Sequence, residues 1–442
     1  MSSETAAAPR RVLTIADAVA FFVGIVIGVG IFRTPPIVAS ATGSEVLFIG
    51  AWIAGGLATL IGALCYAELA AAYPDAGGEY QFLSRAYGHR LAVLFAWARG
   101  TVIQTGAIAL VGFVFGDYAQ QLLPLGPNGP GIYAAISVIL FTAVNIAGTQ
   151  PGAGMQKLLE TCTVLAIIVV VVVGFTVSGT EMKPVEPGAG GMLGLAMVLV
   201  LLSYGGWNEI AYLSGELRDV KRDMTRAIFI GTAIVTVLYV AFNLALLKAF
   251  GLGGIAASKA PGADLMQIAA GSTGVAILAL TVCLSSLSTL NGTIFTGARV
   301  YYALGRDLPL IAKLGVWNER GDNPANAFLL QGAISLALVV FGLITRDGFS
   351  TMVDYTAPVF WFFLMLTGLS LFIFRIREPN RPRPFKVPLY PLTPAIFVGI
   401  CAYLLYSSLA YTGWGALVGI AVVIIGLPLV LVSKRATAQE PA

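Results

Sequence analysis

The stretch GIVIGVGIF, at residues 24–32, places glycines inside an apolar segment that is long enough to cross a membrane. The stretch LLSYGGWNE, at residues 201–209, interrupts a later apolar segment with a pair of glycines. A glycine in a helix interior costs about 1 kcal/mol relative to alanine, so such interruptions weaken a helix. Two interrupted apolar segments at corresponding places in the two halves of a chain indicate the binding site of a secondary transporter.

Composition identifies the chain as a membrane protein. Hydrophobic residues make up 57% of its 442 residues and charged residues 11%, whereas soluble domains carry about 25% charged residues. Apolar stretches near or above the roughly 20 residues that cross a bilayer predict an all-α protein with twelve transmembrane helices. They lie at 14–38, 45–72, 91–123, 131–147, 157–177, 191–213, 227–250, 274–299, 326–345, 354–374, 393–411 and 414–433.

The basic residues predict how these helices are oriented. If both termini are cytoplasmic, most of the 26 Lys and Arg residues fall on the inside, as the positive-inside rule requires. Residues 1–13 and 434–442 are then cytoplasmic ends of a multi-pass protein, which we expect in a bacterial cytoplasmic membrane. The net charge of +4 reflects this topology, so we expect membrane lipid and no nucleic acid as a partner.

The chain divides into two similar halves. Residues 14–177 and 191–374 each hold five of the expected helices, and each half opens with an interrupted one. An odd number of spans turns the second half upside down relative to the first, which predicts an inverted repeat. Residues 393–433 form two further helices that we expect at the periphery.

The two interruptions offer complementary backbone groups. The first leaves the N–H groups of residues 29–31 without helical partners, and the positive end of the helix dipole there suits a carboxylate. The second leaves the carbonyls of Leu202, Ser203 and Gly205 free to accept from an ammonium group. Together they suit the zwitterion of an α-amino acid. The alternative is that these glycines only allow close packing of helices.

Signals for other functions are weak. A single histidine and no paired cysteines leave almost no ligands for zinc or haem, so we expect no cofactor. The sequence lacks HExxH and GxSxG, so we expect no enzyme. A channel would need a repeated polar face along a span, which we do not identify in the sequence. A channel and a membrane-embedded enzyme therefore stay distant alternatives.

Five motifs follow one another along the chain: GIVIGVGIFRTPP, YAELAAAYPDAGGEYQFLSRAYG at 66–88, YGGWNEIAYLSGELRD at 204–219, LSSLSTLNGTIFTGAR at 284–299 and RPRPFKVPLYP at 381–391. They resemble those of the amino acid-polyamine-organocation (APC) family, nearest its L-type amino-acid transporter branch. The similarity covers nearly the whole chain in order, and YAEL followed by P, GG and Y is its most specific part. The resemblance implies the LeuT-type 5+5 inverted-repeat fold with discontinuous first and sixth helices, and alternating access for L-amino acids by symport or exchange.

The resemblance also implies where the substrate binds. The amides of Val29 and Gly30 would bind the carboxylate, and the carbonyls of Val26, Leu202 and Gly205 the ammonium. No carboxylate is evident for a cationic side chain, so we expect neutral L-amino acids, with amines or polyamines as the alternative. The expected substrate-binding residues are Val26, Gly28, Val29, Gly30, Leu202, Ser203, Tyr204, Gly205, Gln104 and Phe360.

The chain departs from the family pattern in three places. Leu202 stands where an aromatic residue usually closes over the substrate, which leaves substrate size open. Thr163 stands where many relatives carry a lysine in place of a sodium ion, which leaves the coupling ion, proton or sodium, open. A sodium site would use Gly24, Ile27, Ser288 and Thr289. The outer loop after the third span holds no cysteine, so we expect no disulfide-linked accessory subunit.

Ionisable residues within the spans need partners or water. Arg99 and Glu160 each lie about ten residues from the cytoplasmic end of a span, roughly 15 Å deep, and could form a structural ion pair or take part in gating. Glu209 follows the second interruption and is the best candidate for a proton carrier, although a structural role is an equal alternative.

Overall fold

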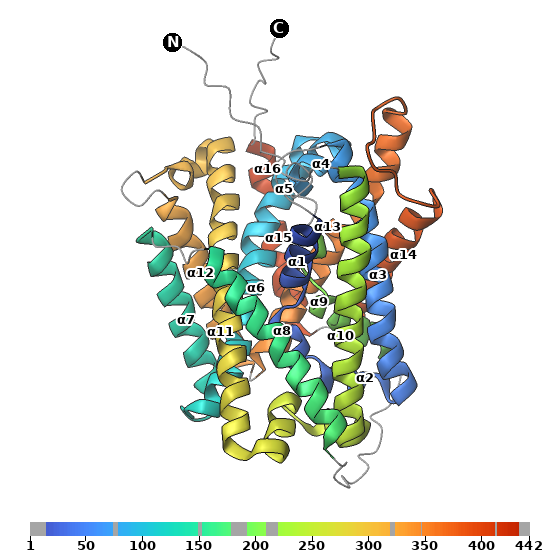
Figure 1. Ribbon diagram of the computed structural model, residues 1–442. Coiled ribbons are helices and arrows are strands. Elements are labelled where there is room, and N and C mark those ends of the chain that lie inside the picture. Colours follow the sequence, from blue (N-terminus) through green and yellow to red (C-terminus); the bar gives the residue numbers. More distant parts are fainter. Residues whose placement is uncertain are drawn as a thin grey trace.

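The computed structural model describes residues 15–73, 78–148, 153–177, 192–208, 220–318, 323–345, 347–411 and 413–432. Within these ranges the chain is a bundle of long helices. In Figure 1, α1 (Ile15–Val26) and α9 (Leu193–Ser203) lie in the middle of the bundle. Long helices surround them.

Eight described helices are long and apolar enough to cross a membrane, or nine if α1 and its bent continuation count as one span. Three shorter apolar helices lie at Thr161–Thr176, Leu193–Ser203 and Trp414–Val430. An all-α membrane protein is therefore confirmed, while the twelve spans and the inverted repeat stay predictions. The spanning helices are α3 (Glu45–Ala72), α5 with η2 and α6 (His89–Leu122), α7 (Gly129–Ile146), α10 (Val220–Ala257), α11 (Pro261–Asp307), α12 (Ala325–Ile344), α13 (Gly348–Arg377) and α14 (Leu392–Tyr411).

Both expected interruptions are present. After α1, a 3-10 helix η1 (Val29–Phe32) leads into α2 (Pro35–Thr42), and the chain bends by 68° between the two parts. Prolines open α2, where their missing N–H groups leave no helical bond unmade. The second interruption ends α9 at Ser203. The part of the sixth stretch beyond residue 208 lies outside the described residues.

The third expected span is not a regular helix. Between α5 (His89–Ala98) and α6 (Thr105–Leu122) lies a π-helix, η2 (Arg99–Gln104). A π-turn contains an extra residue and frees carbonyls from the helical pattern. Tyrosines from two other helices bond them: the Tyr301 hydroxyl donates to Gly100 O at 2.7 Å, and the Tyr355 hydroxyl donates to Thr101 O at 2.8 Å.

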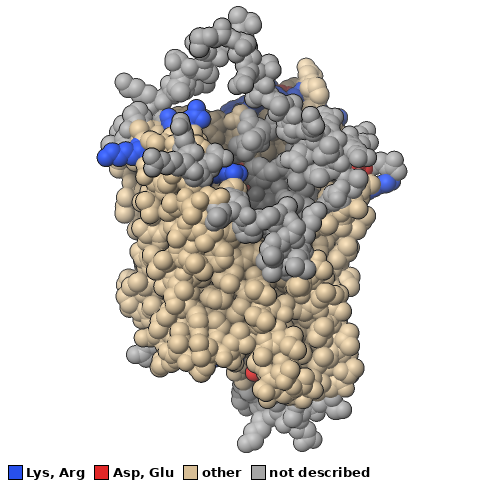
Figure 2. Space-filling view, turned by 60° about the vertical axis from the view of Figure 1, so that its left-hand side comes forward, with Lys and Arg blue, Asp and Glu red and all other residues tan. Residues whose placement is uncertain are grey.

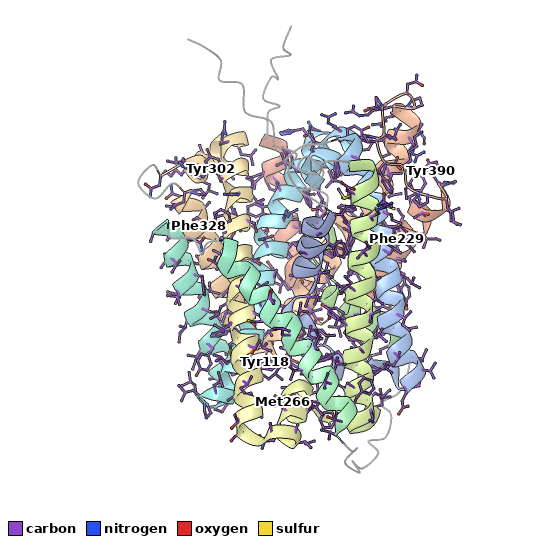
Figure 3. The ribbon with its side chains drawn as sticks, viewed as in Figure 1. Tyr118, Phe229, Met266, Tyr302, Phe328 and Tyr390 are labelled. Atoms are coloured by element: carbon purple, nitrogen blue, oxygen red, sulfur yellow. The ribbon has the colours of Figure 1, made fainter. Side chains whose placement is uncertain are left out.

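Two helices extend beyond their expected ends. Both α10 and α11 include a kink, at Gly251 (φ 64°) and Gly271 (φ 60°), where a left-handed backbone favours glycine. The segment between the kinks buries apolar side chains, Ile255 and Leu265 among them, so it packs onto the bundle. Figure 3 labels Met266 of this segment at the lower end of the molecule.

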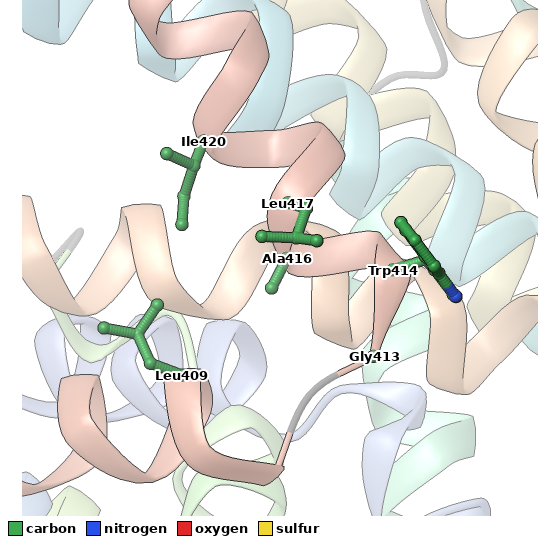
Figure 4. A pocket seen from close by; sticks show the side chains of 6 residues that line it. All are labelled: Leu409, Gly413, Trp414, Ala416, Leu417 and Ile420. Carbon is green, nitrogen blue, oxygen red and sulfur yellow. The ribbon is translucent and has the colours of Figure 1, made fainter.

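The surface fits a lipid environment. In Figure 2, the Lys and Arg side chains gather at the upper end, above a tall band of uncharged residues. Large apolar side chains such as Val237 and Ile277 are more than half exposed. Figure 4 shows a shallow apolar groove of α14 and α15 (Trp414–Ile425), where Trp414 is 79% exposed. No lining residue of this groove belongs to the interrupted helices.

The proline-rich segment after α13 folds against the C-terminal part of α3. Glu68, with 2% of its side chain exposed, accepts two hydrogen bonds of 2.7 Å from Arg375. Arg383 Nε lies 3.4 Å from the same carboxylate, and the Val387 N–H donates to it at 2.7 Å. One buried carboxylate therefore joins α3 to α13 and to the connection that leads into α14.

Candidate substrate-binding site

The first interruption presents free backbone amides. Val29 and Gly30 open the 3-10 turn, so their N–H groups have no acceptor within it. Gly28 has an extended backbone (φ −93°, ψ −177°), and a Cβ built on it would have no atom within 4 Å. The free amides thus directly follow a glycine that adjoins open space, and free amides at the start of a helix can bind a carboxylate.

The second interruption presents backbone carbonyls, some of which already accept hydrogen bonds. Gly205 N–H donates to Leu202 O at 3.0 Å, and the Tyr204 N–H is shared between that carbonyl and Val200 O. Gly206 has a φ of 93°, a left-handed backbone that turns the chain sharply at this point. Leu202 is partly buried, and Ser203 and Tyr204 are buried.

Tyr239 joins the two interruptions, and sequence analysis missed it. Its buried hydroxyl lies 3.0 Å from Val26 O and 3.0 Å from Ser203 O. Val26 O also accepts from Gly28 N–H at 2.8 Å, and the single Tyr239 proton is shared between Val26 O and Ser203 O. An ammonium group would have to replace the Tyr239 hydroxyl to bind Val26 O. A tyrosine within a long span carries no sequence signal for this role.

Side chains fill the α2 side of the interruptions. Thr34 Oγ1 and Ser203 Oγ are hydrogen-bonded at 2.8 Å, which joins the two interrupted helices directly. The Phe32 ring makes edge contacts with Tyr118 and Phe242, at centroid distances of 6.2 and 5.7 Å. Figure 3 labels Tyr118 in the lower half of the bundle. The structure is therefore closed here, whereas Gly28 adjoins open space.

Gln104 lies against a polar stripe on α11. Its side-chain amide donates to Thr293 O at 2.9 Å and to Thr296 Oγ1 at 3.2 Å. Thr289, Thr293 and Thr296 recur at a spacing that places them on one helix face, and all three are at least partly exposed. Sequence analysis identified no repeated polar face, which is wrong for this span. Its pattern LSSLSTLNGTIFT carried the signal.

Comparison with known proteins decides the family. A profile described as "Amino acid permease" matches residues 13–432. The chain belongs to the amino acid permease family. This confirms the APC resemblance: the permease is a transporter and an integral multi-pass membrane protein, not an enzyme, and its family transports amino acids.

Named transporters are similar over most of their length. "Large neutral amino acids transporter small subunit 2" of Mus musculus is 30% identical over 436 residues, which cover 95% of the permease and 80% of that protein. "b(0,+)-type amino acid transporter 1" of Mus musculus is 28% identical, with coverages of 88% and 81%. "Asc-type amino acid transporter 1" of Mus musculus is 27% identical, with coverages of 95% and 80%.

The coupling residues of the permease stay predictions. Thr163 is buried in α8 (Ala153–Thr176), a helix that contacts α1, α10 and α11. Ser288 and Thr289 are partly exposed on α11. Gly24 and Ile27 lie in and after the last turn of α1. Glu209 lies outside the described residues.

Arg99 has a partner that sequence analysis did not name. Its Nη1 lies 2.6 Å from Glu79 Oε2, in the short helix α4 (Gly78–Tyr87). The side chain of Glu160 lies outside the described residues, so its expected pairing is not tested. Phe360, the last expected pocket residue, is partly buried in α13 and contacts Trp361 at a centroid distance of 5.0 Å.

Proposed function

We propose that this permease carries neutral L-amino acids across the membrane by alternating access, as a symporter or an exchanger. The observation that carries the proposal is the pair of interruptions, which offers free amides at Val29 and Gly30 and carbonyls at Leu202 and Gly205. These groups complement both ends of an amino-acid zwitterion.

The side chains around the interruptions favour a neutral substrate. Residues 26–34 and 200–208 contain a single charged residue, Arg33, and it pairs with Asp117 at 3.0 Å. A cationic substrate would find no carboxylate in these segments, and an unpaired charge at this depth is costly. Two relatives, the "Large neutral amino acids transporter small subunit 2" and the "Asc-type amino acid transporter 1", support amino acids as the substrate class.

The same proposal includes the LeuT-type fold with twelve spans and both termini in the cytoplasm of a bacterium. Each of the twelve expected stretches overlaps one of the described apolar helices, including the bent pair and the three short ones. We also propose that the permease works without a disulfide-linked subunit. Its four cysteines are free and lie within helices, where a bond to a partner's loop is out of reach.

Uptake into proteoliposomes tests the proposal. Labelled leucine, alanine, arginine and glutamate are compared with putrescine and leucine methyl ester, each with a proton gradient, a sodium gradient or internal leucine. We expect uptake of leucine or alanine and none of the ester or the diamine. Uptake of putrescine or the ester would contradict the carboxylate site. Dependence on internal leucine alone would identify an exchanger without a coupling ion.

A further inference from the structure

Glu79 contacts the π-helix η2 and a residue that follows the second interruption, and it is not one of the expected substrate-binding residues. Its carboxylate is buried, with 9% of the side chain exposed. It accepts from the Tyr66 hydroxyl at 2.7 Å and pairs with Arg99 at 2.6 Å. A longer hydrogen bond of 3.4 Å comes from the Asn208 side-chain amide. The two short contacts therefore hold Glu79 in place, and the longer one reaches the second interruption.

The partners of Glu79 lead directly to the site. Arg99 is the first residue of the π-helix η2, and Gln104 is the last. Asn208 comes five residues after Ser203, the end of α9, and directly after Trp207. The Trp207 ring makes an edge contact with Tyr66 at a centroid distance of 5.1 Å. A single carboxylate thus connects the π-helix of the third span to the turn that follows the second interruption.

Charge explains why Arg99 and Tyr66 hold Glu79 firmly. A buried carboxylate needs charged or hydrogen-bonding partners, and removal of one partner leaves the other charge uncompensated. Arg99 and Tyr66 satisfy Glu79 with short contacts, so the carboxylate keeps its position. Asn208 is a neutral donor to that fixed charge, and at 3.4 Å its bond is weaker than the two short contacts.

We propose that Glu79 is a positioning residue for substrate binding: through Asn208 it holds the turn after the second interruption, and so sets the direction of the carbonyls at Leu202 and Gly205. This inference rests on the proposed function, because those carbonyls bind the substrate ammonium there. Glu79 itself touches no substrate.

Variants of the two residues test the inference in the full-length permease. Binding of L-leucine is measured for Asn208→Ala, Glu79→Gln and the double variant, together with the melting temperature in detergent. Loss of one hydrogen bond predicts a Kd raised about three- to tenfold for each single variant. The double variant should bind no more weakly than the weaker single variant, because both act through one contact. Glu79→Asp keeps the charge and should restore part of the affinity.

Glu378 provides a control with the same kinds of partner and a more exposed side chain. It accepts from the Tyr73 hydroxyl at 3.0 Å and pairs with Arg381 at 3.1 Å, so it repeats the tyrosine–carboxylate–arginine arrangement at the end of α13. Burial and the hydrogen bond to Glu378 raise the pKa of Tyr73 to about 12. Glu378→Gln should leave the Kd unchanged.

The outcomes separate this inference from the proposed function. If the unaltered permease binds none of leucine, alanine and serine, the proposed function is wrong and the inference falls with it. If it binds leucine, three results overturn the inference alone: an unchanged Kd in Asn208→Ala, an additive loss in the double variant, or an equal loss in Glu378→Gln. If Glu79→Gln fails to fold, the Kd of Asn208→Ala decides the question.

Discussion

Gly28 and Gly30 stand two residues apart in the first interruption, yet their surroundings differ. A Cβ on Gly30 would lie 3.2 Å from Ser203 Cα, whereas a Cβ on Gly28 would meet nothing within 4 Å. The sequence predicts that the helix is interrupted here. It does not predict which glycine is packed, because Ser203 approaches from another helix far along the chain.

Alanine at these two positions should have separable effects. Gly30→Ala should lower the melting temperature, because overpacking against a backbone atom costs about 1–3 kcal/mol. Gly28→Ala has an extended backbone that alanine adopts readily, so its melting temperature should not change. Its methyl group would occupy the open space and weaken leucine binding. Normal leucine binding in Gly28→Ala would place the substrate elsewhere.

Tyr239 shows what sequence reasoning about single residues misses. Its role depends on two carbonyls that only the folded chain brings within reach of one hydroxyl. Tyr239→Phe removes the donor that joins the interruptions, and we expect leucine uptake to fall several-fold, with a loss of about 1 kcal/mol in stability. Tyr87→Phe is the control, since its hydroxyl donates to Leu366 O at 2.7 Å, away from the interruptions. An equal loss of uptake in both variants would refute a specific role for Tyr239.

At the scale of elements, prediction succeeded where local sequence decides the structure. The stretch 45–72 was predicted as a span and coincides with α3, because Ser44 caps its start and Pro74 follows its end. The π-helix η2 and the extensions of α10 and α11 were not predicted. Each depends on contacts from distant helices, such as the Tyr301 and Tyr355 hydroxyls that bond the freed carbonyls.

We expect the Glu68 carboxylate, which joins α3 to α13, to contribute strongly to the stability of the fold. Glu68→Gln would leave Arg375 and Arg383 without their shared charge, and breaking such a buried pair costs about 3–5 kcal/mol. We expect a large drop in the melting temperature in detergent. Glu378→Gln should cost less than about 1 kcal/mol, because 38% of that side chain is exposed. Similar drops would show that burial of Glu68 does not matter.

On the scale of the whole molecule, contacts between the interrupted helices are concentrated on the α2 side. The Thr34–Ser203 hydrogen bond joins the two interrupted helices there, and the Arg33–Asp117 ion pair connects the first of them to α6. Under alternating access these contacts must separate when that side opens. The sequence predicted an anion site at the first interruption and a cation site at the second. It could not predict on which side of these two sites the folded chain would be closed.

Ion coupling is a property of the whole molecule, and a substitution of Thr163 can test it. A lysine amine at this buried position would take the place of a bound cation between α1, α8 and α11. If transport depends on sodium, Thr163→Lys should keep transport and remove that dependence. Uptake in proteoliposomes with and without a sodium gradient measures this. A sodium dependence that survives in Thr163→Lys would place the ion site away from residue 163.

The π-helix between Arg99 and Gln104 changes how residues of this span can be compared with those of relatives. Each residue turns an α-helix by about 100°, so one extra residue rotates everything before it by that angle relative to everything after it. A relative without the bulge would match this span in length and hydropathy to within one residue. An ungapped alignment that matched Gln104 correctly would then place Arg99, the partner of Glu79, on the wrong helix face.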